Sequence, residues 1–280
     1  MAIDIEVLSE RIGGNPGGKC SVRESTGAGF NGYFKFVYGP SPVPHSFFTA
    51  AHQPIYEAAT FELAKWLGLS TPKTYVLLNK DKSVRFYGWK EFEKKDPSGR
   101  DYYFISELLQ CKLDREKGSD EKATNIIESQ KDYLECLRIS DIVGKRQNYI
   151  LCGEEGNERV VYIDLGCSFV HAVGGMLKKP SKVNFNGKRE KKRVVDTLSK
   201  NSLISSDNGR FIDLGEIEHF VDKMRVSTLN PRGRIALSEL LETAEIEEII
   251  NDVLSGFIGS LGSLRNDGLL VTNSYSIRTN

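Results

Sequence analysis

The sequence predicts an α+β protein with two lobes, on the basis of two observations. Runs of β-branched and aromatic residues, separated by glycine-rich or polar turns, recur through residues 1–92 and predict a small β-rich lobe. Apolar residues at three- and four-residue spacing recur through residues 93–271 and predict a larger helical lobe. Residues 272–280 are polar and are expected to form a flexible tail.

Composition narrows the functional classes. The 38 basic and 38 acidic residues cancel, so no overall field favours nucleic acid or a membrane surface. Five cysteines, odd in number and without a CxxC pair, suggest neither a disulfide framework nor a zinc site and favour a reducing compartment. The first residues do not resemble a signal peptide, and no apolar run approaches the roughly 20 residues of a membrane span. We therefore expect a cytoplasmic protein.

Several segments have patterns that predict individual elements. Residues 74–78 and 83–89 are strand-like runs joined by a polar turn, and residues 94–101 form a charged, exposed insertion. Apolar spacing predicts one long helix over residues 123–142 and helical structure throughout residues 212–270.

Two oxygen-bearing side chains flank a predicted hairpin. Asn148 precedes the apolar run 149–151, Asp164 follows the run 160–163, and residues 152–157 have the composition of a turn. Mg²⁺ prefers a few hard oxygen ligands and leaves its other positions for phosphates and water. This arrangement predicts a site for Mg²⁺ and ATP.

A lysine stands inside a strand-like run. Residues 32–38 are rich in aromatic and β-branched side chains and predict a central strand that contains Lys35. A buried lysine is costly unless a phosphate or carboxylate pairs with it, which makes Lys35 a candidate phosphate ligand. The alternative is that Lys35 lies on a solvated face together with Tyr33 and Val37.

The glycine-rich segment 13–21 allows three interpretations. Gly17, Gly18 and Lys19 fit a hairpin whose glycines let the backbone approach a phosphate. Residues 13–19 also match a Walker A loop, as in a P-loop NTPase, until Cys20 replaces the hydroxyl that binds Mg²⁺. A plain surface loop is the third interpretation.

The segment 55–67 predicts a helix that Gly68 ends. From residue 57 to Pro72 the chain closely resembles the E-x-x-A-x-x-L-A-x-x-L-G-L-x-x-P helix and turn of HipA-like atypical kinases, distant relatives of phosphatidylinositol and protein kinases. Residues 163–169 resemble the I-D-hydrophobic-G-x-x-F segment of the same family, and residues 141–148 resemble a variant of its catalytic loop.

This resemblance implies a two-lobed protein-kinase-like fold and an ATP- and Mg²⁺-dependent phosphotransferase that acts on a Ser/Thr hydroxyl of a protein. In the family the glutamate at position 57 pairs with the strand lysine, although Glu57 would also suit the first turn of any helix. Glu91 fits a hinge between the lobes that meets the adenine. The resemblance assigns catalytic roles to Asp141, Lys35 and Glu57, nucleotide contacts to Gly17, Gly18, Lys19, Lys35 and Glu91, and metal binding to Asn148 and Asp164.

The chain departs from the family at the catalytic aspartate. The family has that residue five positions before the asparagine, where this chain has Val143, whereas Asp141 lies seven positions before it. The alternative is therefore a pseudokinase or nucleotide-binding module, in which Asp141 only caps a helix or pairs with a neighbouring cation. Residues 178–193 include the basic strip Lys188 to Arg193, which is either solvated or docks an acidic partner.

Overall fold

The molecule is described from a computed structural model. The structure describes residues 3–10, 15–25, 27–36, 50–89, 97–109, 119–139, 141–142, 148–154, 156–169, 206–207, 211–212 and 220–249. The predicted hinge residue Glu91 and the basic strip 188–193 lie outside these residues.

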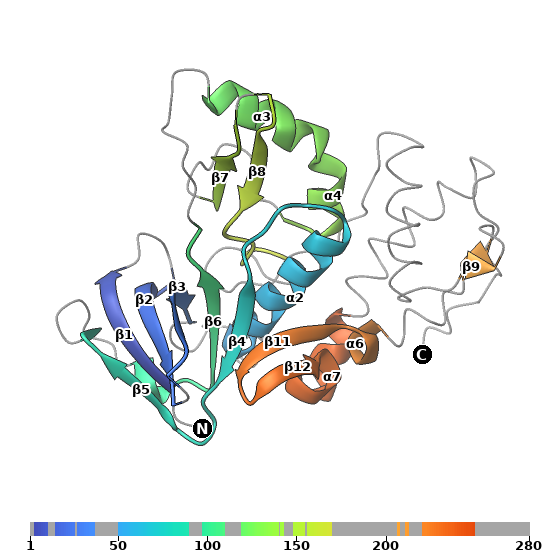
Figure 1. Cartoon of the computed structure of the whole chain (residues 1–280). Helices are drawn as coiled ribbons and strands as arrows, with labels where there is room; N and C mark the ends of the chain where they lie inside the picture. The colour runs from blue at the N-terminus through green and yellow to red at the C-terminus, as the bar shows by residue number, and fades with distance from the viewer. Residues whose placement is uncertain are drawn as a thin grey trace.

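A curled eight-stranded sheet forms the largest layer, in the order β12-β11-β4-β6-β3-β2-β1-β5 (Figure 1). Its strands are β1 (Ile3–Glu10), β2 (Gly17–Glu24), β3 (Gly29–Lys35), β4 (Thr74–Leu78), β5 (Val84–Tyr87), β6 (Tyr102–Glu107), β11 (Arg225–Asn230) and β12 (Arg232–Ala236). Neighbouring strands are antiparallel except for the parallel pairs β1–β5 and β4–β11. The expected division of the chain at residue 92 stays a prediction, and this sheet takes strands from both sides of it.

Strands β1, β2 and β3 form an antiparallel meander in which the two glycines begin β2. Gly18 pairs with Glu10, and Gly17 pairs with Lys35. A Cβ atom on Gly17 would lie 2.1 Å from the Phe34 carbonyl oxygen, so the strands approach too closely for any side chain there. The prediction that residues 17–19 form the hairpin turn is wrong, because the connection between β1 and β2 is residues 11–16, of which 11–14 lie outside the described residues.

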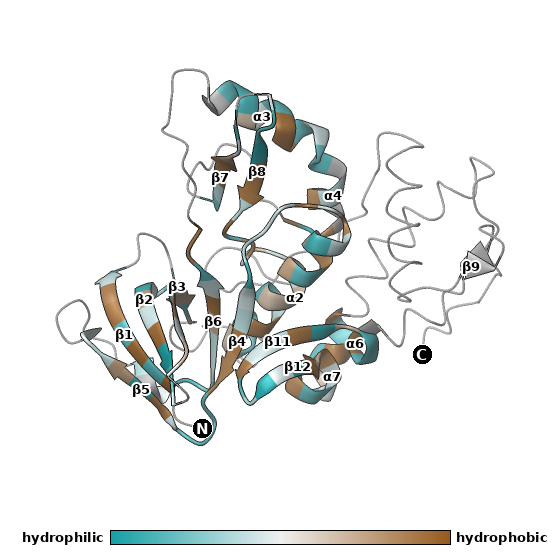
Figure 2. Ribbon diagram, viewed as in Figure 1, coloured by the Kyte–Doolittle hydropathy of each residue, from teal (hydrophilic) through white to brown (hydrophobic). Residues whose placement is uncertain are grey.

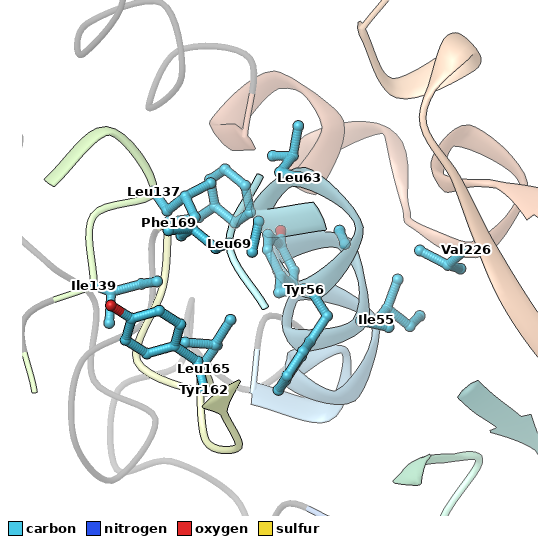
Figure 3. Close-up of a cluster of buried hydrophobic side chains, with 14 of the residues drawn as sticks. Ile55, Tyr56, Leu63, Leu69, Leu137, Ile139, Tyr162, Leu165, Phe169 and Val226 are labelled. Atoms are coloured by element: carbon cyan, nitrogen blue, oxygen red, sulfur yellow. The ribbon is translucent and has the colours of Figure 1, made fainter. Parts of the chain in front are cut away.

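Helix α2 (Gln53–Trp66) lies at the centre of the molecule. Pro54 occupies its first turn, where no amide hydrogen is required, and Gly68 follows its end with a φ of 80°, as the sequence predicts. Every residue from Gln53 to Ala64 is buried, because the helix is covered on more than one side. Figure 3 shows Leu137 and Phe169 on one side of α2 and Val226 on another.

The predicted helix over residues 123–142 is two helices. They are α3 (Ser119–Ser129) and α4 (Lys131–Cys136), separated by a turn at Gln130. Arg138 then adopts a φ of 54°, a backbone conformation that is incompatible with a continuing α-helix. In Figure 2, α3 is mostly hydrophilic with a hydrophobic band, and its Ala123 and Ile127 are buried in the core. Strands β7 (Tyr149–Cys152) and β8 (Arg159–Tyr162) form the antiparallel hairpin that the sequence predicts.

The prediction of helical structure over residues 212–270 is wrong for residues 225–236, which form the β11–β12 hairpin. Buried Val226 and Thr228 alternate with more exposed positions, a strand pattern, and Asn230-Pro231 makes the turn. β11 adds to the edge of the sheet beside β4. The helical pieces nearby are α6 (Phe220–Lys223), α7 (Leu237–Leu240) and residues 243–249, and a two-stranded sheet is formed by β9 (Ser206–Asp207) and β10 (Phe211–Ile212).

One hydrophobic core joins α2 to all the elements around it. It includes Phe104 of β6, Ile127 of α3, Tyr162 of β8 and Leu237 of α7. A second core, built around Phe34, fills the opposite face of the curled sheet. The large shared core fixes how α2 lies against the segment that carries Asp164.

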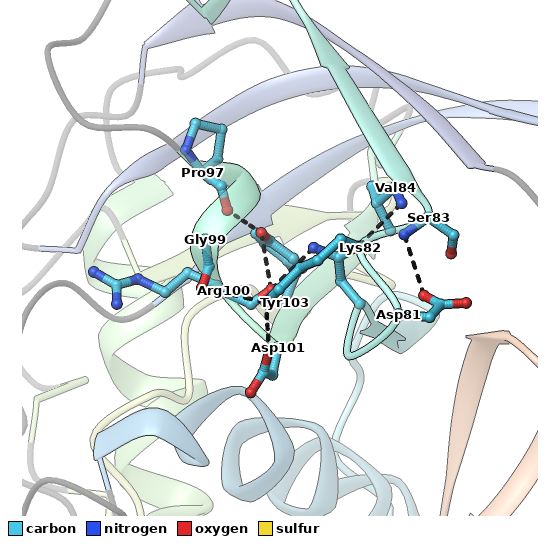
Figure 4. Close-up of polar contacts among 10 residues, drawn as sticks. Asp81, Lys82, Ser83, Val84, Pro97, Gly99, Arg100, Asp101 and Tyr103 are labelled. Carbon is cyan, nitrogen blue, oxygen red and sulfur yellow. Dashed lines mark hydrogen bonds and ion pairs between the residues drawn. The ribbon is translucent and has the colours of Figure 1, made fainter.

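The segment that was expected to be an exposed insertion is partly ordered by polar contacts (Figure 4). The 3-10 turn η2 (Pro97–Gly99) lies beside the turn between β4 and β5, where the Tyr103 hydroxyl donates to the Pro97 carbonyl. Lys82 Nζ lies 2.6 Å from Asp101 Oδ1, and the Asn79 side chain donates to the Arg100 carbonyl at 3.0 Å. None of these contacts involves a predicted site residue.

Cys152 forms a disulfide bond, although the five scattered cysteines suggested no disulfide framework. A disulfide bond requires two cysteines that the fold holds close together, and spacing along the sequence does not show which cysteines these are. Among the described residues, no helix is both long enough and apolar enough to cross a bilayer.

Candidate active site

Lys35 is the last residue of β3 and points toward α2. Its side chain is 6% exposed and forms an ion pair with Glu57 of α2, and its Nζ lies 2.8 Å from Asp164 Oδ1. The ammonium group also lies 5.1 Å from the centre of the Phe104 ring, on the neighbouring strand β6. The interpretation of Lys35 as a residue of a solvated face is therefore wrong.

The cluster brings together three charged groups. The Lys35 ammonium group contacts two carboxylates, and the side chains of Glu57 and Asp164 are 3% and 23% exposed. Burying a charge costs several kcal/mol unless an opposite charge compensates it. The contacts with Lys35 therefore offset part of the cost of burying these carboxylates.

Asn148 and Asp164 lie at the same end of the β7–β8 hairpin. Tyr149 pairs with Tyr162, and the Asn148 carbonyl accepts hydrogen bonds from the amides of Ile163 at 2.9 Å and Asp164 at 3.3 Å. The hairpin register thus brings the two predicted metal ligands to adjoining positions. Asn148 is 3% exposed, so it is far less accessible than Asp164.

Asp141 is tied to the same place through its main chain. The Asn148 Nδ2 atom donates to the Asp141 carbonyl oxygen at 2.8 Å, which holds residues seven positions apart in contact. This bond uses the amide nitrogen of Asn148, and the amide oxygen is the atom that a cation needs. Residues 143–147, which include Val143, lie outside the described residues.

Sequence analysis missed two polar residues of α2. Gln53 Nε2 donates to the Gly166 carbonyl at 2.9 Å, and the hydroxyl oxygens of Thr60 and Ser168 are 2.5 Å apart. Gln53, Glu57 and Thr60 are spaced by four and three residues, which puts them on one helix face. A polar stripe on a buried helix was the available signal, but its partners lie more than 100 residues away.

The structure rejects the Walker A interpretation of residues 13–19. Lys19 lies inside strand β2, whereas that loop must open into a helix. Lys19 is exposed and shares a sheet face with Gly17, the partner of Lys35. Gly17 is thus the direct cross-strand partner of Lys35, and Gly18 and Lys19 pair with the two residues before it, Phe34 and Tyr33.

The donors suit Mg²⁺ better than a transition metal. The described residues contain no group of three or more His, Cys, Asp and Glu side chains that could hold a metal by themselves. One asparagine and one aspartate supply hard oxygen atoms, the set that Mg²⁺ completes with phosphate and water. The residues present therefore fit a metal that arrives with a nucleotide.

A hollow of about 320 Å³ lies away from this cluster, at the C-terminal end of α2. Its lining includes Lys65, Lys73 and Arg159 and none of the predicted site residues. Lys65 forms an ion pair with Glu62 at 3.0 Å, so at least one of the three basic side chains that line the hollow is already neutralised.

Comparisons with known proteins find distant likenesses among solved structures. No protein-family model matches the chain, and no curated protein matches it. Among solved structures, the chain is similar to the Rio2 kinase–ADP/Mg²⁺–phosphoaspartate complex from Chaetomium thermophilum, at 8% identity and a TM-score of 0.36. The match covers 71% of this chain and 53% of the other, so this chain spans about half of that protein's length. A likeness this weak decides nothing about the site, and membership of the HipA-like family stays a prediction.

Proposed function

We propose that the chain binds Mg²⁺–ATP and transfers its terminal phosphoryl group to an alcohol, namely a Ser/Thr hydroxyl of a protein. The observation that carries the proposal is the buried Lys35, which pairs with Glu57 and also with Asp164, 129 residues further along the chain. Phosphoryl transfer depends almost entirely on positioning and charge stabilisation, and these groups have the charges it needs.

Lys35 would hold the α- and β-phosphates, oriented by Glu57. The ion pair with Glu57 is buried, so the Lys35 ammonium group would stay in place when Asp164 binds a metal. Gly17, Gly18 and Lys19 would line the phosphates from the start of β2, next to Lys35. Glu91 stays the proposed hinge contact to adenine.

Asn148 and Asp164 would hold Mg²⁺. The metal would neutralise charge on the transferred phosphoryl group. This chain's contribution is to fix the two oxygen ligands on adjoining positions of one hairpin, where the Asn148 carbonyl is bonded to the Asp164 amide.

Asp141 would orient the acceptor hydroxyl. Such a carboxylate must come within about 3 Å of the hydroxyl, or reach it through one water. The hydrogen bond from Asn148 to the Asp141 carbonyl brings the two residues together and supports this role.

Paired measurements on Asp141→Ala test the transfer step. Phosphoryl transfer to a protein acceptor should fall by about a hundred-fold or more, while ATP affinity stays within about two-fold, because Asp141 contacts the acceptor and not the nucleotide. Turnover, ATP binding and melting temperature are measured on one preparation. Unchanged turnover in the folded variant would remove Asp141 from the mechanism.

A second candidate is a nucleotide-binding module without transfer activity. It is favoured by Val143, which stands where the family has its catalytic aspartate. In that case the basic strip Lys188 to Arg193 would bind an acidic partner, and salt would weaken the interaction. A wild type that binds Mg²⁺–ATP but phosphorylates neither itself nor any protein in a broad acceptor panel would select this candidate.

A further inference from the structure

We infer that Gln53 and Thr60 are positioning residues that hold the Asp164 loop, residues 164–169, against α2 and so set the metal-binding geometry of Asp164. The inference rests on the proposed function, because it assigns to these two side chains the geometry that Mg²⁺ would require. Gln53 lies outside the sequence motifs that suggested the site, and Thr60 stands at a position of the helix motif where the family has alanine.

Three successive positions of α2 contact the loop. Gln53 bonds the Gly166 carbonyl, Glu57 meets Asp164 through Lys35, and Thr60 meets Ser168. The three contacts join one face of the helix to alternate residues of the loop, 164, 166 and 168, which makes them a continuous seam. A shift of α2 would break all three together.

This seam between α2 and the Asp164 loop is buried, so the loss of one of its hydrogen bonds costs stability. Gln53 is 3% exposed, and Thr60 and Ser168 are each 0% exposed. Water cannot replace a missing partner there, and a buried polar group left unpaired costs about 1–3 kcal/mol. The loop therefore has one strongly favoured position against the helix.

The protons at Thr60 can be assigned from chemistry. Thr60 Oγ1 lies 2.8 Å from the Tyr56 carbonyl, which only accepts, and 2.5 Å from Ser168 Oγ. A hydroxyl has one proton, so Thr60 donates to Tyr56 and Ser168 donates to Thr60. Thr60 thus links the helix backbone to the loop, and a side chain without a hydroxyl leaves Ser168 unpaired.

The loop is also fixed at its far end. The Phe169 amide donates to the Leu137 carbonyl at 3.3 Å, and the Phe169 ring is buried beside Leu137 (Figure 3). Phe169 has a φ of 46°, which is uncommon for a residue other than glycine and is held here by the surrounding packing. With Phe169 anchored, Thr60 and Gln53 determine where the Asp164 end of the loop lies.

Gly166 leaves no free space between the helix and the loop. A Cβ atom at this position would lie 3.0 Å from Glu57 Oε2 and 3.4 Å from Asp164 Oδ1. The Gly166 amide also donates to Asp164 Oδ1 at 3.2 Å. The Gln53 hydrogen bond to this residue therefore acts two residues from the proposed metal ligand.

The experiment compares ATP affinity with Mg²⁺ and with EDTA in Thr60→Val, Thr60→Ser and Gln53→Leu. Partners that orient a metal ligand typically contribute about ten-fold to metal affinity. Thr60→Val and Gln53→Leu should each lose about ten-fold of the Mg²⁺-dependent gain, with affinity in EDTA unchanged. Thr60→Ser keeps the hydroxyl and should restore the gain.

Thr228→Val is the matched control. Thr228 is also buried. Its hydroxyl contacts the Pro231 and Gly233 carbonyls in the β11–β12 hairpin, so it has no role at the proposed site. It should lower the melting temperature and leave the Mg²⁺-dependent gain intact. An equal loss of that gain in this control would reduce Thr60 to a general structural role.

Two failures can be told apart. If the wild type gains affinity with Mg²⁺ and both Thr60→Val and Gln53→Leu keep that gain, the positioning role is wrong and the proposed function stands. If the wild type itself shows no gain, the proposed function fails, and this inference fails with it.

Discussion

Lys35 Nζ lies 2.8 Å from Asp164 Oδ1, although the two residues are 129 positions apart. Lys35 ends a strand of the N-terminal meander, and Asp164 follows the β7–β8 hairpin. Their contact joins the N-terminal meander to the segment after the β7–β8 hairpin, so a charge cluster connects these two parts of the chain in addition to apolar packing. This cluster is the basis of the proposed nucleotide site.

Removing Lys35 should destabilise the fold. In Lys35→Met the Glu57 carboxylate, 3% exposed, loses its counter-charge. Breaking a buried ion pair from one side costs about 3–5 kcal/mol of unfolding free energy. The double variant Lys35→Met/Glu57→Gln should recover much of this loss, as measured by urea denaturation. If the double variant is no more stable than Lys35→Met, the buried charge is not the cause.

Helix α7, which follows the β11–β12 hairpin, should contribute strongly to the stability of the fold. Leu237 of α7 is 0% exposed in the core that contains α2, so Leu237→Ala should cost about 2–5 kcal/mol. Leu8→Ala is the control, because Leu8 is 48% exposed and its loss should cost less than about 0.5 kcal/mol. Equal costs in thermal or urea unfolding would mean that α7 does not pack in the core with α2.

A methyl group on Gly166 should disturb the metal site. Gly166→Ala places a Cβ 3.0 Å from Glu57 Oε2, tighter than ordinary van der Waals contact, so the loop must shift. We expect about a ten-fold loss of Mg²⁺-dependent ATP affinity. Gly99→Ala, where nothing lies within 4 Å of the added atom, should have no effect. A normal affinity in Gly166→Ala would contradict the close fit of this loop.

Two thiols should differ strongly in reactivity. Cys20 is fully buried, and desolvation raises the pKa of its thiol to about 12, so at pH 8 roughly one molecule in 10,000 has the thiolate. Cys167, in the Asp164 loop, is partly exposed. Iodoacetamide at pH 8 should label Cys167 at least ten-fold faster than Cys20 in the native protein, as quantified by peptide mass spectrometry. Comparable rates would show that β2 opens readily.

Much of the local structure follows from the sequence. Helix α2 and its glycine end depend on short-range periodicity and capping, and the β7–β8 hairpin depends on two apolar runs and a turn. The hairpin also explains why Asn148 and Asp164 could be predicted as neighbours. The expected contact between Lys35 and Glu57 is present as well.

The remaining features depend on contacts between distant segments. Residues 225–236 were predicted as helical, but the free edge of β4 pairs with them, and a local pattern does not show which edge is available. The roles of Gln53 and Thr60 were missed because their partners lie in the loop after β8. Gln130 separates two short helices whose apolar residues have similar spacing. Periodicity alone therefore predicted one continuous helix.

Calorimetry of ATP binding with and without Mg²⁺, for the wild type and Asp164→Asn, tests the central claim most directly. An amide keeps the shape of the side chain but loses the charge that holds the metal. We expect the wild type to bind ATP about ten-fold more tightly with Mg²⁺ and Asp164→Asn to show no such gain. A wild type whose affinity ignores Mg²⁺, or a variant that keeps the full gain, would contradict the assignment of this site.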